Sequence, residues 1–282
     1  MYGISYNSIE KHYYIMKKLT KKEIGNLGLY EFQGYIGAMT SPTFGGWKGT
    51  DRLIELLDII DMEHPRILEV GCSTGYITRY IAKKFDSELI GVDLSNLLLE
   101  IAENEAKQQN LTNVSFQNGS AENLQFPDNY FDIVYGEAIT ALVPDPIKVI
   151  NEYHRVLKPG GKLATLDLFM KESLRKEFAE EINKIMSNVI GSKIKIKTFQ
   201  EWTQIFKDSG FKEIKIKDYY DDLFKREYSS GNMMKIIFKT FYYMITNKLI
   251  RKKITPTLKF ARKFQKVLNE GYLGYLIFFG NK

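Results

Sequence analysis

The chain has 282 residues, of which 44% are hydrophobic and 26% charged, a balance that excludes a mainly disordered protein. It contains no run of about 18 apolar residues, so no transmembrane helix is predicted, and its first residues lack the pattern of a secretory signal. Cys72 is the single cysteine and only 3 histidines occur, which excludes an intrachain disulfide and argues against a metal centre. We therefore expect a cytoplasmic protein without a bound metal.

The net charge of +6 hides an asymmetry along the chain. Residues 225–282 carry 13 Lys and Arg against 2 acidic residues, whereas the rest of the chain carries 27 basic and 32 acidic residues. An acidic body joined to a basic C-terminal segment indicates two separate roles.

The first 60 residues are predicted to form helices and turns, with one helix near Ile9–Lys22 and another at Thr50–Ile60. We interpret residues 1–60 as a helical lid. From Arg66 onward, short apolar runs alternate with helical periodicity, which predicts a parallel sheet with helices on both faces. The expected strands and helices of this part are Ile67–Gly71, Glu88–Val92, Val114–Gln117, Phe131–Tyr135 and Lys162–Leu168, and Tyr76–Phe85, Leu97–Gln109 and Ile147–Leu157.

Helix caps and further elements follow from the same patterns. Ser95 and Asp145 are expected to cap two of these helices, and Thr198 with Glu201 forms a capping box before the helix that carries Trp202. The later elements are a helix at Glu172–Val189 and strands at Phe211–Tyr219 and Tyr272–Gly280. Residues 221–270 are interpreted as a basic helical insertion whose second helix starts at Thr255-Pro256. The core is then 61–220, completed by a last strand in 271–282.

The segment Ile67–Gly75 carries the strongest chemical signal. It reads as a strand, a tight turn of small residues and the start of a helix. Gly71 and Gly75 let a ligand approach the backbone, and the N–H groups at the start of a helix favour polar or anionic groups. Asp93 ends the next strand, 22 residues after Gly71, where a carboxylate can accept both hydroxyls of a ribose.

Two kinds of nucleotide ligand compete for this pattern. A dinucleotide fingerprint needs glycines at the positions occupied here by Ser73 and Tyr76, and the large aromatic argues against NAD or FAD. The alternative pattern is Glu69-x-Gly71-x-x-x-Gly75 followed by Asp93. It resembles the first motif of class I S-adenosylmethionine-dependent methyltransferases, which usually have glycine in place of Ser73.

Later segments extend the resemblance over residues 65–168 and 198–219. Residues 119–134 resemble the family's adenine-binding turn and fourth strand, and 152–162 resemble the turn before its fifth strand. The chain is most similar to methyltransferase type 11-like proteins, including small-molecule, lipid-headgroup and sterol methyltransferases. This implies an α/β fold with a Rossmann-like, seven-stranded, mostly parallel sheet, S-adenosyl-L-methionine as cofactor and S-adenosyl-L-homocysteine as product. The cofactor-binding residues that the resemblance implies are Glu69, Gly71, Cys72 (through its backbone N–H), Ser73, Gly75, Asp93, Leu94, Ser120, Ala121 and Glu122.

Residues 35–50 resemble the lid of these methyltransferases, in which a tyrosine closes over the cofactor. In some relatives a histidine follows the fourth strand, but Leu142 stands near that place here, which argues against a histidine mechanism. The candidate catalytic residues are Glu137 and Tyr35, and the candidate substrate contacts are Tyr30 and Trp47.

The predicted function is methyl transfer, by in-line displacement, to a small-molecule acceptor of apolar or lipid-like character. One alternative is a non-catalytic scaffold that keeps the cofactor site. Another is an RNA methyltransferase that uses the basic segment, although the sequence after the fourth strand lacks an Asn-Pro-Pro-Tyr signature. The basic segment itself is open to interpretation as a solvated helix face, a lid, or a peripheral membrane contact through 233–268, with nucleic acid disfavoured. The oligomeric state stays open.

Overall fold

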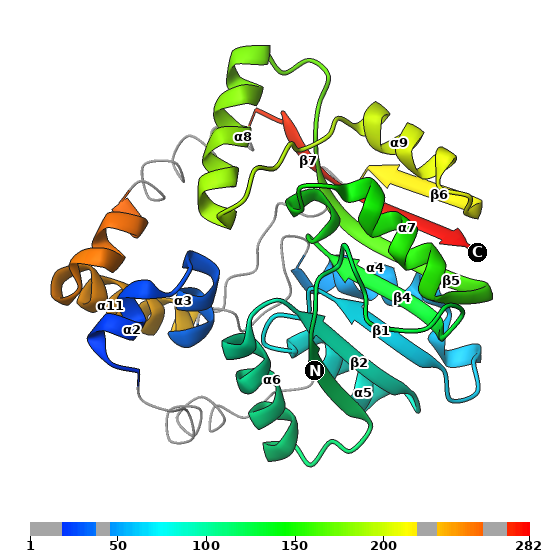
Figure 1. The fold of residues 1–282 in the computed structure, drawn as a ribbon, viewed down its shortest axis with the longest axis horizontal. Coiled ribbons are helices and arrows are strands. Elements are labelled where there is room, and N and C mark those ends of the chain that lie inside the picture. Colours follow the sequence, from blue (N-terminus) through cyan, green and yellow to red (C-terminus); the bar gives the residue numbers. More distant parts are fainter. Residues whose placement is uncertain (1–18, 38–45, 219–229, 256–269) are drawn as a thin grey trace.

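A seven-stranded sheet forms the centre of the computed structural model, which describes residues 19–37, 46–218, 230–255 and 270–282 (Figure 1). Its strands are β1 Arg66–Val70, β2 Glu88–Asp93, β3 Val114–Asn118, β4 Phe131–Glu137, β5 Leu157–Met170, β6 Lys212–Asp218 and β7 Leu273–Asn281. The strand order is β3-β2-β1-β4-β5-β7-β6. Strands β1 to β5 run parallel, and β7 is antiparallel to both of its neighbours. The predicted mostly parallel, Rossmann-like sheet is confirmed.

Helices cover both faces of this sheet (Figure 1). They are α4 Gly46–Leu57, α5 Tyr76–Lys84, α6 Asn96–Gln108, α7 Pro146–Val156, α8 Lys176–Ile190 and α9 Phe199–Asp208, with short 3-10 turns η1 Ile59–Asp61 and η2 Thr140–Leu142. The strand order reverses between β1 and β4, and at such a reversal the carboxyl ends of two parallel strands open a crevice. No helix in the described ranges is long and hydrophobic enough to pass through a bilayer.

Side-chain caps fix where several of these helices begin. The Ser95 hydroxyl accepts the N–H of Leu98, and Asp145 accepts the N–H of Lys148 directly before Pro146. Thr198, the residue before α9, forms the expected capping box with Glu201. The three predicted caps are confirmed, and each contributes about 1 kcal/mol to helix stability.

The main core lies between the sheet and its helices. Phe278 of β7 stacks on Phe206 of α9 with ring centroids 3.7 Å apart, and Trp202 is fully buried beside them. Helix α4, which the sequence groups with the lid, packs into this core through Leu53 and Leu57. Part of the segment interpreted as a lid therefore packs with the sheet.

A second, smaller core joins the N-terminal helices to the insertion. It is built from α2 Lys21–Asn26, α3 Leu29–Tyr35, α11 Ser230–Thr246 and the helical residues 248–255. Its buried members are Ile24, Phe32, Ile36, Ile250 and Ile254. We call this unit the helical lobe, and it lies beside the sheet in Figure 1.

Polar contacts also join the two halves of the helical lobe. The Asn247 side chain donates to the Lys21 carbonyl at 2.8 Å. The Lys253 ammonium donates to the carbonyls of Gly25 and Leu27, at 2.9 and 2.6 Å, which suits the negative end of α2. Segments predicted as a separate lid and insertion therefore form one unit, although more than 200 residues separate them.

Two predicted helix limits and one helix that was not predicted need comment. The helix expected at Ile9–Lys22 lies mostly outside the described residues, and α2 begins only at Lys21, after the Thr20 cap. Helix α3 has no counterpart among the predicted elements, because short helices interrupted by glycines show little periodicity. Thr255 is the last described residue of a helix that is already formed at residue 248, and the rest of the helix predicted to start at Thr255-Pro256 lies outside the described residues.

Candidate functional site

The turn after β1 is folded back by its own backbone hydrogen bonds. The N–H groups of Gly71 and Cys72 both donate to the Val92 carbonyl, at 2.8 and 3.0 Å. The N–H of Ser73 donates to Asp93 Oδ2 at 2.9 Å. The Cys72 N–H, which the sequence analysis assigns to the cofactor, is therefore already engaged by a carbonyl of β2.

Packing explains two other small residues of this turn. The Cys72 side chain is only 3% exposed, and burial raises the pKa of its thiol well above the usual range, which favours a packing role over nucleophilic chemistry. A Cβ on Gly75 would lie 2.5 Å from the Phe116 ring and 2.8 Å from Ala102. The absence of a side chain at Gly75 thus permits the turn to pack against β3 and α6. Gly75 also has a φ of 65°, in the left-handed region that favours glycine.

Asp93 ends β2 with its carboxylate held from two sides. Its Oδ2 accepts the N–H of Ser73 and its Oδ1 accepts the N–H of Ser95, both at 2.9 Å. Burial raises the pKa of Asp93, and these two N–H groups oppose the rise. Because each carboxylate oxygen can accept two hydrogen bonds, the group keeps acceptor capacity for a ligand. The next residue, Leu94, is 72% exposed and offers apolar surface beside this acid.

Helix α3 of the helical lobe reaches the same place. Glu31 Oε1 accepts the Ser95 hydroxyl at 2.8 Å, and its Oε2 accepts the N–H of Gly28 at 3.0 Å. Burial and the nearby Asp93 carboxylate raise the pKa of Tyr30. Tyr30, predicted as a substrate contact, therefore lies near the acid that ends β2. Glu31 is absent from the predicted site, although the Gly28-x-x-Glu31 spacing of a helix start was a usable signal.

A pair of carboxyl groups is buried where β1 and β4 end. Glu69 accepts hydrogen bonds from the hydroxyls of Thr78 and Tyr135, the latter at 2.7 Å. Burial raises the pKa of Glu69 to about 7, the two hydroxyls oppose the rise, and the neighbouring Glu137 adds to it. Glu137 is 6% exposed. Two acids in one low-dielectric site favour a cation beside them.

Tyr35 and Trp47 are the remaining candidates from the N-terminal part of the chain. The Tyr35 ring packs in the helical lobe, 6.4 Å from the ring of Tyr243. Tyr35 thus belongs to the small core of the helical lobe, whereas Glu137 ends β4 in the sheet. Trp47 belongs to α4, and its side chain lies outside the described part.

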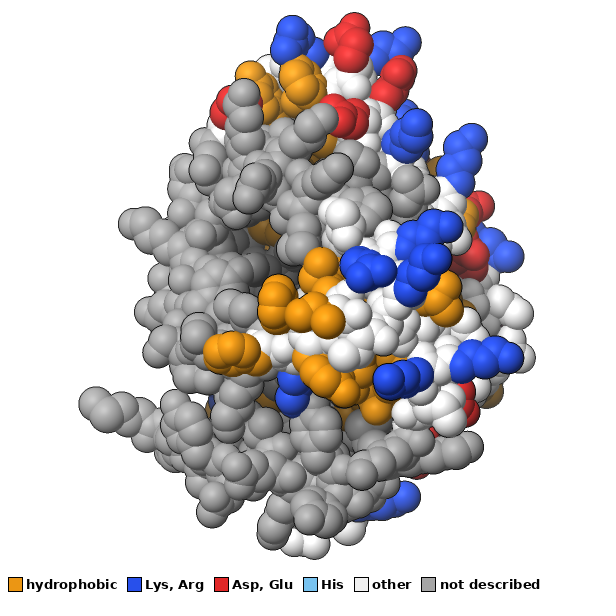
Figure 2. Space-filling model, turned by 90° about the vertical axis from the view of Figure 1, so that its left-hand side faces the viewer, with side chains coloured by type: hydrophobic (Ala, Val, Ile, Leu, Met, Phe, Trp, Pro, Cys, Tyr) orange, Lys and Arg blue, Asp and Glu red, His pale blue; other side chains and the backbone are white. Residues whose placement is uncertain are grey.

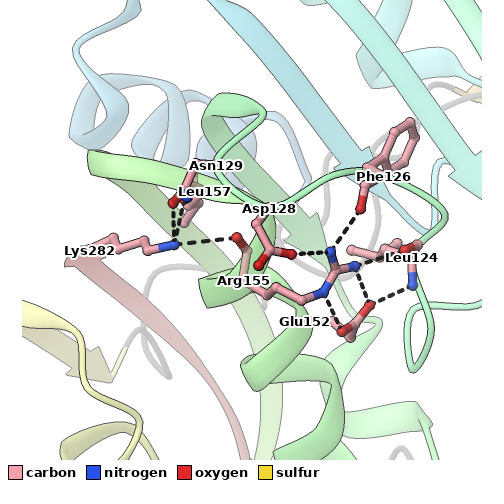
Figure 3. A network of polar contacts seen from close by, with 8 residues as sticks. All are labelled: Leu124, Phe126, Asp128, Asn129, Glu152, Arg155, Leu157 and Lys282. Carbon is pink, nitrogen blue, oxygen red and sulfur yellow. Dashed lines mark hydrogen bonds and ion pairs between the residues drawn. The ribbon is translucent and has the colours of Figure 1, made fainter.

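The turn after β3 is clamped by a network centred on Arg155 (Figure 3). The guanidinium donates to the carbonyls of Leu124 and Phe126 at 2.8 and 2.7 Å and pairs with Glu152 and Asp128. Glu152 also accepts the N–H of Leu124 at 2.7 Å. This network holds the turn rigidly against α7.

The predicted adenine-binding residues begin that turn. The Ser120 hydroxyl accepts the N–H of Glu122 at 3.2 Å, and Glu122 Oε1 accepts the N–H of Asp145 at 2.9 Å. Ala121 is buried. Both polar side chains shape the turn, and Glu122 ties it to the start of α7.

Asp167 of β5 anchors the segment after β4. Its Oδ1 accepts the N–H of Ala141 at 2.9 Å, and the hydroxyls of Thr140 and Thr165 also face this carboxylate. Burial raises the pKa of Asp167 to about 6, against the opposing N–H of Ala141.

This acid predicts a pH-dependent stability. Because the folded pKa of Asp167 lies above its ordinary value of 3.8, the folded state holds the proton more tightly. The free energy of unfolding should fall by about 3 kcal/mol as pH rises from about 4 to about 6, and then stay level. Asp167→Asn should remove that fall and raise stability at pH 7 by about 1–3 kcal/mol, as measured by urea unfolding. Parallel stability curves for the two proteins between pH 4 and 7 would contradict this assignment.

Within the described ranges, no group of three or more His, Cys, Asp or Glu side chains could hold a metal ion. The reversal of strand order, the small-residue turn after β1 and the acid that ends β2 define a nucleotide-binding protein with a Rossmann-like fold. A family model described as "Methyltransferase domain" matches residues 62–210, just over half of the chain, which therefore belongs to that family. The protein is a class I S-adenosylmethionine-dependent methyltransferase.

Individual relatives agree with this placement. Demethylmenaquinone methyltransferase of Geobacillus sp. is 30% identical over 174 residues, which cover 55% of this chain and 74% of the relative. The crystal structure of the [4+2]-cyclase SpnF superposes with a TM-score of 0.70 at 19% identity, covering 95% of this chain and 97% of that one. Phosphoethanolamine N-methyltransferase 2 of Haemonchus contortus, solved with phosphomonomethylethanolamine and S-adenosylhomocysteine, has a TM-score of 0.69 at 20% identity. That match covers 94% of this chain and 58% of the other, and both structural likenesses concern the fold.

Proposed function

We propose that this chain transfers the methyl group of S-adenosylmethionine to an apolar small-molecule acceptor, with Glu137 accepting the proton that the acceptor loses. The observation that carries the proposal is the position of Glu137. It is a carboxyl only 6% exposed at the end of β4, close enough to Glu69 to raise that residue's pKa. A buried carboxylate beside the reacting atoms is suited to general-base work.

The crevice residues suit the three parts of the cofactor. Asp93 has acceptor capacity for the ribose hydroxyls, and the exposed Leu94 offers an apolar face to the adenine ring. Glu69 supplies negative charge for the methionine ammonium. When bound, the cofactor supplies an electrophilic methyl group on a sulfonium. Gly71, Ser73, Gly75 and the turn at Ser120, Ala121 and Glu122 shape the walls of this site.

The surroundings of Glu137 favour an apolar acceptor. The seven residues between Glu137 and Asp145 carry no charge, and Ala141 and Leu142 among them are buried. The Ile139 side chain covers Gly71, with atoms 3.0–3.2 Å from where a Cβ would stand. This stretch offers no cation for an acceptor phosphate. The relative that acts on demethylmenaquinone, an apolar acceptor, supports the same reading.

The residues of the chain would contribute in two ways. Holding the acceptor in line with the methyl group can supply about 7–11 kcal/mol of the barrier, and α3 of the helical lobe, tied to Ser95 by Glu31, closes over the crevice. Proton removal by Glu137 contributes about a hundredfold or more when the acceptor's pKa is high.

The proposal is tested by transfer of a labelled methyl group to quinol, phenol and prenyl acceptors, with a phosphobase for comparison. Glu137→Gln should lower kcat by about 100-fold or more while leaving the dissociation constant of the cofactor nearly unchanged. The matched control is Glu103→Gln on α6, a half-exposed acid that should leave kcat unchanged. Full kcat in Glu137→Gln would remove its role as base, and cofactor binding without transfer to any acceptor would favour a non-catalytic scaffold.

Cofactor affinity should depend on pH through Glu69. If the methionine ammonium meets the ionised carboxylate, binding competes with the proton held at a pKa of about 7. The dissociation constant should then rise up to about tenfold for each pH unit below 7 and level off above it, with protons released on binding. Calorimetry of S-adenosylhomocysteine in buffers of different ionisation enthalpy measures both quantities. Glu69→Gln should bind weakly at every pH, and an unaltered pH profile in that variant would contradict the assignment.

A further inference from the structure

Helix α11 exposes a row of large apolar side chains on the outside of the helical lobe. Phe238, Phe241, Tyr242 and Ile245 are 65, 62, 56 and 61% exposed, and Leu249 beyond them is 46% exposed. Their spacing of three and four residues places the first four on one side of the helix. Figure 2 views the molecule from the side of the lobe and shows hydrophobic side chains gathered there, with Lys and Arg side chains beside them. We call these five residues the outer row.

The outer row is not part of the core of the helical lobe. The inner side of the same region already packs against α2 and α3 through Tyr243, Met244, Ile250 and Ile254. Phe32 meets the Tyr243 ring edge-on at 5.5 Å. Helix α11 therefore carries apolar side chains on two sides. One side is buried by packing within the helical lobe, and the other stays exposed and can bind a partner.

The stretch that carries the outer row has charge of one sign. Residues 238–255, whose side chains are described, contain 5 Lys and Arg and no Asp or Glu. Lys248, Arg251 and Lys252 are exposed near the end of the row, whereas Lys253 is used inside the lobe on carbonyls of α2.

We infer that the outer row, with Lys248, Arg251 and Lys252, docks the protein on the surface of an anionic lipid bilayer. Aromatic and aliphatic side chains flanked by basic ones match the boundary between headgroups and acyl chains. Each Lys or Arg near an anionic surface strengthens binding by roughly fivefold. Pairing of two copies through this face would instead bring like charges together, which charge complementarity disfavours.

The helical lobe connects this face to the crevice. Helix α3, which shares the small core with α11, places Glu31 on the Ser95 hydroxyl beside Asp93. Docking would therefore hold the crevice close to the bilayer, where an apolar acceptor accumulates. Only this last consequence rests on the proposed function, since the docking itself needs neither cofactor nor acceptor.

The test is cosedimentation of the full chain with sucrose-loaded vesicles, without cofactor or acceptor. One set of vesicles is phosphatidylcholine alone and the other also contains phosphatidylglycerol, each at low and high salt. The first variant, Phe238→Ser/Phe241→Ser/Ile245→Ser, removes apolar surface, and the second, Lys248→Glu/Lys252→Glu, reverses charge. The matched control, Ile60→Ser/Ile147→Ser, removes side chains that are 80 and 54% exposed away from the lobe. Thermal unfolding of each variant shows whether it folds as the parent does.

The parent chain is expected to sediment with anionic vesicles at least tenfold more strongly than with neutral ones, and high salt should weaken this binding. Each lobe variant should lose at least tenfold, whereas the control should bind as the parent does. Equal binding to both vesicle types, no binding, or an equal loss in the control would overturn the proposal. So would vesicle-independent dimerisation that the apolar variant abolishes, or RNA binding that only the charge variant weakens. Because the readout involves no methyl transfer, its failure is distinguishable from a failure of the proposed function.

Discussion

Replacing Gly75 with Ala is expected to destabilise the fold by about 2–5 kcal/mol, from overpacking and a disfavoured backbone conformation. A Cβ there would lie 2.5 Å from the Phe116 ring and 2.8 Å from Ala102, at a φ of 65°. The Phe116 atoms are the far end of a ring that can turn, but the Ala102 Cβ is fixed to the backbone of α6, so the turn after β1 or helix α6 must shift. Urea unfolding measures the loss directly.

Gly191→Ala is the matched control for this substitution. Gly191 also has a positive φ, 85°, but nothing lies within 4 Å of its missing Cβ, so only the conformational cost of about 1–2 kcal/mol remains. Adding Phe116→Ala to Gly75→Ala should cost less than the two single changes summed, since the clash with the ring is removed and only that with Ala102 remains. An equal cost for Gly75→Ala and Gly191→Ala would refute the packing role.

Replacing Asp93 with Ala should weaken binding of S-adenosylhomocysteine by about 100-fold or more, because two charge-assisted hydrogen bonds of about 1.5–3 kcal/mol each are lost. The substitution also frees the N–H groups of Ser73 and Ser95, which now position the turn. Asp93→Asn should be nearly as damaging, because an amide has one acceptor oxygen and its NH₂ group would face one of those N–H donors. Calorimetric titration measures the affinity.

The control for Asp93 lies at the other end of the same strand. Glu88 begins β2, is half-exposed and pairs with Arg66 at 2.9 Å. Glu88→Gln removes the same charge from β2, and we expect the cofactor's dissociation constant to stay within about twofold, because exposed ion pairs contribute little. Cofactor affinity in Asp93→Ala within fivefold of the parent chain would show that this acid does not hold the ribose.

The parallel sheet and the crevice were predictable because their signals are local. Each strand is a short apolar run between turn residues, and the caps at Ser95, Asp145 and Thr198 act over three or four residues. The position of Asp93 follows from the same logic, since it is the last residue of its strand.

The helical lobe was not predictable in this way. Its core forms between Phe32 near one end of the chain and Ile250 near the other, and no local periodicity reports such a pairing. The hydrogen bond between Glu31 and the Ser95 hydroxyl depends on that pairing, so it could not be predicted from the sequence either. The hydrogen bond from the Cys72 N–H to the Val92 carbonyl was equally unpredictable. A motif shows which residues form a turn, but not which carbonyl accepts its N–H groups.

At Ser73, a backbone conformation that costs stability serves the binding site. It adopts a φ of 50°, a conformation that favours glycine, while its N–H orients the Asp93 carboxylate. Strain of this kind persists where the surrounding structure over-determines it, as at ligand sites.

The most direct measurement is a structure of the chain in complex with S-adenosylhomocysteine. We predict the ribose hydroxyls at hydrogen-bond distance, about 2.5–3.0 Å, from the Asp93 carboxylate, the adenine ring on Leu94 and the ammonium toward Glu69. A nucleoside bound elsewhere, or an Asp93 carboxylate turned away from it, would contradict the account.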